Sequence, residues 1–176
     1  MSERWDDWIK PYLFFGQHVF ILEFHNGNYQ NTFFYSGLGA EFNPAPRVRL
    51  NFSMEFGNSL LFDEVQSYPV GDIESTAKIN VDGSYSFVYT PKVDWSVGAG
   101  TFIASPVSKK GASTGVGFLA QSQVDYLIGN NLTLQGGLFS RVFTIKMAGV
   151  SQNTKDLGVV FNLRWRIPAK HLEPLK

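Results

Sequence analysis

The residue types best suited to chemistry lie around two connections between segments of alternating hydrophobicity. His25 ends the first such segment, and Ser59, Asp63 and Ser67 belong to the loop of residues 58–76. A histidine beside a hydroxyl and a carboxylate is the minimum set for acyl transfer or ester hydrolysis, because the imidazole takes the hydroxyl proton while the carboxylate fixes its tautomer. His25 also begins the turn sequence His-Asn-Gly, so a structural role is the first interpretation and catalysis the second.

Metal and cofactor chemistry find little support in the sequence. The chain has no cysteine, which excludes disulfides, iron–sulfur clusters and thiolate zinc sites. The three histidines, His18, His25 and His171, are too scattered for a metal site, and no phosphate loop, HExxH motif or nucleophile elbow occurs. We therefore expect neither a metal nor another cofactor, and we place His18 on the apolar face, near the base of its strand.

Composition limits the class of protein. Among the 176 residues only 17% are charged, against roughly 25% in ordinary soluble domains. Fifteen acidic and fifteen basic side chains cancel, so composition indicates no basic surface for nucleic acid. An aromatic content of 15% favours strands, and no run of 18 apolar residues that would form a transmembrane helix is present.

Hydrophobicity alternates with a period of two through almost all of the chain after residue 17, which predicts β-strands. Short connections alternate with generally longer ones, so the chain moves between two unlike ends. This pattern predicts an all-β fold, an eight-stranded antiparallel up-and-down barrel. The expected strands are residues 18–25, 31–43, 47–57, 77–89, 95–105, 115–127, 132–145 and 157–167.

The two faces of each strand differ sharply. In the third strand Leu50, Phe52 and Met54 share one face, while Asn51 and Ser53 share the other. A soluble barrel with the apolar face inward and a membrane barrel with the apolar face toward lipid both produce this alternation.

The polar face favours the membrane barrel, because it is rich in glycine and carries balanced charges. A narrow lumen needs each buried charge to be paired, whereas a water-facing surface has no packing use for glycine. Arg49 is expected to pair with Glu41, Glu55 or Asp82. The predicted lumen charge network comprises Glu23, Glu41, Arg49, Glu55, Lys78, Asp82, Asp125, Arg141, Arg164 and Arg166.

Aromatic residues near the short turns predict an interfacial girdle, made of Phe42, Tyr89, Trp95, Tyr126 and Trp165, with Trp5 and Trp8 before the barrel. The final strand places Asp156, Gly158, Phe161 and Leu163 in the order of an outer-membrane assembly signal. On these features the sequence resembles the small, eight-stranded bacterial outer-membrane β-barrel proteins. The resemblance implies a transmembrane barrel in the outer membrane with lipid as its partner. It also implies a signal peptide, which we expect to have been removed from this chain.

Three segments follow from this interpretation. Residues 1–16 are expected to form an amphipathic helix and lead-in, because Trp5, Trp8, Ile9 and Tyr12 recur at helical spacing. Residues 17–168 form the barrel, and residues 169–176 a C-terminal tail. The apolar loop 58–76 or the tail could bind an envelope protein.

The resulting functional hypothesis is a non-enzymatic envelope component: a membrane anchor, a surface-interaction protein or a narrow conduit for a small apolar solute. Two alternatives stay open. One is an outer-membrane enzyme that modifies the acyl chains of lipid A, and the other is a soluble, lipocalin-like carrier of a hydrophobic ligand.

Overall fold

The computed structural model describes residues 9–24, 27–59, 73–108, 114–147 and 150–167. For several residues near the strand ends (20–24, 27–31, 58–59, 73–75, 106–108, 145–147, 150, 152 and 154) it describes the backbone alone.

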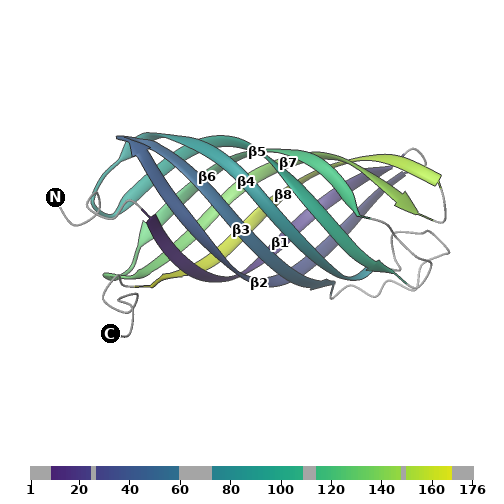
Figure 1. Ribbon diagram of the computed structural model, residues 1–176, viewed down its shortest axis with the longest axis horizontal. Helices are drawn as coiled ribbons and strands as arrows, with labels where there is room; N and C mark the ends of the chain where they lie inside the picture. Colours follow the sequence, from purple (N-terminus) through teal and green to yellow (C-terminus); the bar gives the residue numbers. More distant parts are fainter. Residues whose placement is uncertain (1–8, 25–26, 60–72, 109–113, 148–149, 168–176) are drawn as a thin grey trace, which may run out of the picture.

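The chain forms one closed antiparallel barrel in which each strand pairs with its neighbour in sequence and β1 pairs with β8 (Figure 1). This confirms the predicted eight-stranded fold. The start of β1 and the end of β8 lie at the end of the barrel that carries the short turns (Figure 1). The strands are β1 (Ile9–Phe24), β2 (Gly27–Ala45), β3 (Val48–Ser59), β4 (Ile73–Tyr89), β5 (Val93–Ser108), β6 (Gly115–Leu127), β7 (Leu132–Met147) and β8 (Val150–Arg166).

The barrel begins earlier than expected. Residues 9–16, assigned above to the helix and lead-in, form the first half of β1, paired with β2 and, from Tyr12 onward, with β8. The reason is visible in the same residues: Tyr12 and Phe14 point inward while Leu13 and Phe15 point outward, which is the period of a strand. Trp5 and Trp8 lie outside the described residues. Within those residues, no helix is long and apolar enough to cross a membrane.

The strands are also longer than expected at the opposite end. β7 continues to Met147 and β8 starts at Val150. Residues 148–149 alone therefore connect these strands, in place of the expected link of about eleven residues. The first link similarly shortens to residues 25–26. The short turns match the prediction more closely, and the turn between β2 and β3 is closed by Pro46 and Arg47. Arg47 adopts a positive φ of 67°, and its carbonyl accepts the backbone N–H of Ser86 at 2.8 Å.

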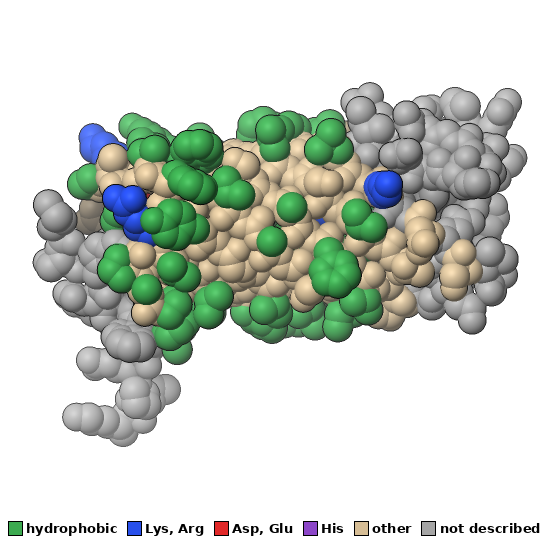
Figure 2. All heavy atoms as spheres, turned by 90° about the horizontal axis from the view of Figure 1, so that it is seen from above, with side chains coloured by type: hydrophobic (Ala, Val, Ile, Leu, Met, Phe, Trp, Pro, Cys, Tyr) green, Lys and Arg blue, Asp and Glu red, His purple; other side chains and the backbone are tan. Residues whose placement is uncertain are grey.

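The barrel is apolar outside and polar inside. Figure 2 shows hydrophobic side chains standing out along the wall of the barrel. Large side chains such as Phe52, Val81 and Leu138 are about half exposed, whereas Asp94, Ser96 and their inward-facing neighbours are almost fully buried.

Inward-facing glycines make room for rings in the lumen. A Cβ added to Gly39 would collide with the ring of Tyr12, and one added to Gly37 would collide with the ring of Phe14. Eight strands enclose only enough space for side chains. A ring can therefore lie flat against the wall only where the facing residue is a glycine, which has no side chain. The glycines of the polar face therefore have a packing role.

Candidate functional site: the polar lumen

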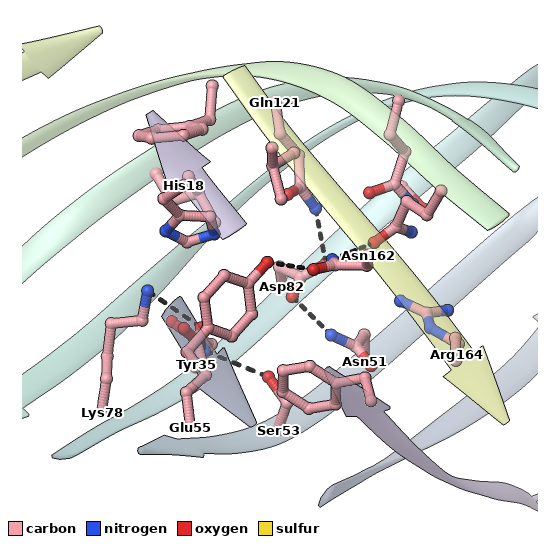
Figure 3. Close-up of a pocket in the computed structure, with 18 of the residues that line it drawn as sticks. His18, Tyr35, Asn51, Ser53, Glu55, Lys78, Asp82, Gln121, Asn162 and Arg164 are labelled. Carbon is pink, nitrogen blue, oxygen red and sulfur yellow. Dashed lines mark hydrogen bonds and ion pairs between the residues drawn. The ribbon is translucent and has the colours of Figure 1, made fainter. Parts of the chain in front are cut away.

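The candidate site is the lumen itself, which contains a cavity of about 80 Å³ lined by residues from seven of the eight strands, β5 excepted. Figure 3 shows His18, Tyr35, Lys78 and Arg164 reaching into this space from the surrounding wall. Because successive side chains of a strand alternate between faces, each strand turns every second side chain into the lumen, and those of seven strands reach this cavity.

Arg49 of β3 crosses the lumen to the far wall. Its Nη1 lies 2.7 Å from Oδ2 of Asp125 on β6 and 3.6 Å from Oδ2 of Asp94 on β5. Its Nη2 donates a hydrogen bond to the hydroxyl of Ser96. Arg49 is 8% exposed, Asp125 3% and Asp94 1%, so this cluster is buried. The carboxylates in ion-pair contact with Arg49 thus belong to β5 and β6, and not to the adjacent strands that carry the expected partners Glu41 and Asp82, nor to its own strand, which carries Glu55.

Arg164 of β8 makes a second link, with Nη1 3.4 Å from Oε2 of Glu41 on β2. Its guanidinium carbon lies 4.2 Å from the centre of the Tyr12 ring, in a cation–π contact. The Tyr12 hydroxyl donates to Oδ1 of Asn51, whose amide donates to Asp82 at 2.8 Å. The guanidinium, the ring and the amide therefore form one connected group between β8 and β4.

Two further ion pairs lie on neighbouring strands nearer the long-loop end. Lys78 Nζ is 2.9 Å from Oε1 of Glu55, and Arg141 Nη2 is 2.6 Å from Oδ2 of Asp156. The Arg141 guanidinium also lies 4.5 Å from the centre of the Phe139 ring. Each of these four charges has an opposite charge within contact distance, as a poorly hydrated interior requires.

Amide side chains join these groups into a chain. The Tyr35 hydroxyl donates to Asn162, the Asn162 amide donates to Gln135 at 2.6 Å, and the Gln135 amide donates to Asp125 at 2.8 Å. Gln121 donates in turn to Asp82 at 3.0 Å. A continuous hydrogen-bonded path thus links β2, β8, β7 and β6 to Arg49 on β3.

His18 lies in the lumen, not on the apolar face. Its ring centre is 4.2 Å from that of Tyr35 and 4.9 Å from that of Phe139. The expectation is wrong because it sets the phase of the strand from residue 18, whereas β1 begins at Ile9 and His18 is in phase with the inward-facing Tyr12 and Phe14.

Most of the predicted lumen residues are found inside the barrel. Glu41, Glu55, Arg49, Lys78, Asp82, Arg141 and Arg164 line the cavity, Asp125 contacts Arg49, and Arg166 follows Arg164 in phase toward the rim. The side chain of Glu23 lies outside those described. Three further inward charges, Lys10, Asp94 and Asp156, were not predicted to face the lumen, because all three lie just outside the expected strands. The sequence does carry a signal for them. Each lies two residues before an inward-facing residue of the same strand: Lys10 before Tyr12, Asp94 before Ser96 and Asp156 before Gly158.

The inward charges that the structure describes balance. The described basic residues Lys10, Arg49, Lys78, Arg141, Arg164 and Arg166 equal in number the carboxylates Glu41, Glu55, Asp82, Asp94, Asp125 and Asp156. A neutral, cross-linked lumen can hold its charged side chains in place without a counterion. The arrangement is suited to closing the barrel rather than to passing an apolar solute.

The predicted girdle residues lie near the short-turn end. Trp95, Tyr126 and Trp165 are each more than 40% exposed on the outer wall, and Phe42 and Tyr89 are half-buried.

Most residues of the candidate catalytic group are not among those that the structure describes. His25, Asp63 and Ser67 lie outside the described residues, and Ser59 is described only as the last backbone position of β3. Among the described residues, no cluster of histidine and carboxylate side chains could hold a metal ion.

Comparison with solved structures places this fold. The chain is similar to Neisserial surface protein A, with a TM-score of 0.63 and 14% identity over 89% of this chain and 97% of the other. The chain is also similar to a major outer membrane protein from Thermus thermophilus, with a TM-score of 0.47 and 12% identity over 89% of this chain and 99% of the other. The N-terminal β-barrel domain of Pseudomonas aeruginosa OprF matches with a TM-score of 0.46 and 15% identity over 85% of this chain and 96% of the other. No protein-family model and no curated protein sequence matches the chain. The likeness to Neisserial surface protein A shows that the two chains share a fold, which in this chain is a closed eight-stranded antiparallel barrel.

Proposed function

We propose that this protein is an integral outer-membrane barrel with a closed lumen. It serves as a non-enzymatic envelope component that anchors and displays its connecting segments at the membrane surface. One observation carries the proposal, which is the inverted polarity of the barrel. Every described carboxylate is turned away from the outer wall, while large apolar side chains on that wall are about half exposed.

The inverted polarity opposes the alternative of a soluble carrier. A lipocalin-like barrel would need its apolar faces inward, against a ligand, and its charges outward in water. Here the interior holds Arg49, Asp94 and Asp125 in contact, and Phe52 and Val81 face out. An apolar wall of this extent is stable only in an apolar solvent, which the hydrocarbon layer of a membrane provides.

The lumen supports anchoring more than transport. Charged and amide side chains cross it at several levels, and the cavity they leave, about 80 Å³, has room for only a few water molecules. An apolar solute would have to displace the Arg49–Asp125 and Arg164–Glu41 contacts without replacing their hydrogen bonds. Of the roles considered for the envelope component, we therefore favour binding of an envelope partner through the 58–76 loop or the C-terminal tail over conduction of a solute.

The test is to dilute urea-denatured protein into phospholipid vesicles and, in parallel, into lipid-free buffer. Folding is followed by the shift in gel mobility between heated and unheated samples, and ion flow by planar-bilayer recording. We expect folding in vesicles only, with no discrete open-channel steps. Glu55→Ala combined with Lys78→Ala, which removes a complete ion pair, should increase the leak and serves as the positive control. Folding in lipid-free buffer, or steady conductance by the unaltered chain, would contradict the proposal.

Catalysis is tested separately through His25→Asn, which keeps a polar turn residue and removes the imidazole. Under the proposed function, outer-membrane lipid from cells that express the variant keeps the acyl-chain pattern seen with the unaltered chain. A change in that pattern while the barrel stays folded would favour the lipid-modifying enzyme.

A further inference from the structure

Among the side chains that the structure describes, those that are charged and exposed on the outer wall are all basic. Among the described residues, the exposed charged side chains are Arg47, Lys92 and Lys155, and no carboxylate is exposed. Arg47 lies in the β2–β3 turn and Lys92 in the β4–β5 turn, both at the short-turn end, whereas Lys155 lies on β8 near the opposite end. Figure 2 shows basic side chains beside hydrophobic ones at the short-turn end of the barrel.

A cluster of exposed rings adjoins the two basic turns. The ring centres of Tyr85 and Phe87 are 5.4 Å apart, and those of Phe87 and Trp95 are 5.5 Å apart. The Trp95 indole N–H donates to Ser122 Oγ at 3.1 Å, which fixes the orientation of the ring. Amphipathic rings of this kind prefer the depth of the lipid headgroups.

Backbone pairing places the two basic residues on turns that adjoin the strands of this cluster. The carbonyl of Arg47 accepts the N–H of Ser86, the residue between Tyr85 and Phe87. Lys92 precedes Trp95 by three residues, and its carbonyl accepts the N–H of Leu127 at 2.8 Å, at the base of β6. Within the described chain neither cation has a carboxylate in ion-pair contact, so both can bind an outside anion at the depth set by the rings.

We propose that Arg47 and Lys92, with the Tyr85–Phe87–Trp95 cluster between them, form a binding site for the phosphate groups of anionic phospholipids at the short-turn end of the barrel. The inference deepens the proposed function and rests on it, because it needs the outer wall to face lipid. An ammonium and a guanidinium gain more from a net negative headgroup than from a zwitterionic one, since the latter carries its own cation. The guanidinium can in addition bind phosphate through two parallel hydrogen bonds.

The experiment uses Trp95 as the reporter. In a chain with Trp5, Trp8 and Trp165 replaced by phenylalanine, Trp95 fluorescence is quenched only by lipids in contact with the cluster. The folded barrel is placed in mixed vesicles in which either phosphatidylglycerol or phosphatidylcholine is brominated high on the acyl chain. We expect quenching to report a several-fold preference for phosphatidylglycerol, up to about fivefold for each cation that contacts a headgroup, with the preference falling as salt is added.

Two variants make the result specific. Arg47→Gln combined with Lys92→Gln should reduce the preference to near unity, whereas Lys155→Gln, which removes a lysine from the other end of the barrel, should leave it unchanged. Equal quenching by the two lipids in the unaltered chain, or a preference that survives the double substitution, would overturn the lipid site alone. Absence of quenching by either lipid would show that Trp95 does not face lipid, which contradicts the proposed membrane location itself.

Discussion

Replacing Arg49 by methionine would leave two buried carboxylates without the cation that they share. Asp125 and Asp94 are each almost fully buried, and Arg49 contacts both, at 2.7 and 3.6 Å. Removing one partner of a buried ion pair costs about 3 to 5 kcal/mol, because the remaining charge is desolvated and uncompensated. We expect Arg49→Met to lower the free energy of unfolding by an amount in that range.

Removing both partners should cost less than the two single changes together. In the variant Arg49→Met with Asp125→Asn, the substituted amide can still accept the hydrogen bond from Gln135, and one carboxylate charge is gone. For groups in direct contact, a coupling free energy of about 1 to 3 kcal/mol is expected. Asp156→Asn serves as the matched control, because Asp156 pairs with Arg141 and should combine with Arg49→Met almost additively.

The assay is urea unfolding of the barrel in lipid vesicles, followed by tryptophan fluorescence for all four chains of each cycle. The refuting result is additivity of Arg49→Met with Asp125→Asn within about 0.5 kcal/mol. That outcome would show that the contact between these two side chains contributes nothing to stability. The same coupling in the Asp156 cycle would instead show that the lumen responds to its total charge rather than to individual pairs.

Further predictions concern packing and hydrogen bonding, and unfolding free energy in vesicles measures each of them. Gly37→Ala should destabilise the barrel by about 1 to 3 kcal/mol, because the added Cβ would overlap the ring of Phe14. Gly136→Ala should have little effect, since the nearest atom to its Cβ would be 3.8 Å away on Phe161, and equal effects would contradict the packing role of the inner glycines. Tyr12→Phe should cost about 1 to 3 kcal/mol by leaving Asn51 without its donor, while Tyr85→Phe on the outer wall should be nearly neutral, and the reverse order would contradict the assignment of faces.

Alternation of residue types was enough to predict the barrel and its two faces. Leu50, Phe52 and Met54 on one side of β3 and Arg49, Asn51 and Ser53 on the other are a local pattern, because neighbouring residues of a strand must point to opposite faces. The period alone therefore assigns side chains to the interior or exterior wherever the strand itself is recognised.

Pairing across the lumen could not be predicted in this way. Arg49 and Asp125 are 76 residues apart and lie on strands separated by two others, so their contact depends on the tilt and stagger of the closed barrel. Sequence neighbours on adjacent strands suggested Glu41, Glu55 or Asp82 instead.

The start of β1 was missed for a related reason. Tyr12 and Phe14 fit the lumen because Gly39 and Gly37 of β2 face them. That complementarity appears only once the register between β1 and β2 is known. Read alone, the same residues fitted a helical spacing that continued from Trp5 and Trp8, and the error in phase also misplaced His18.

The most direct test of the account is to place one arginine on each face of the wall at matched depth. Val81 is the midpoint of β4 and points outward, and Gln121 is the midpoint of β6 and points inward, where its amide contacts Asp82. In vesicles, Val81→Arg should lower the free energy of unfolding by about 2 to 4 kcal/mol, the cost of a cation near the centre of the hydrocarbon layer. Gln121→Arg should change it by no more than about 1 kcal/mol, because the new charge meets the carboxylate of Asp82. A barrel that tolerates Val81→Arg and fails to fold with Gln121→Arg would contradict the orientation on which every functional conclusion rests.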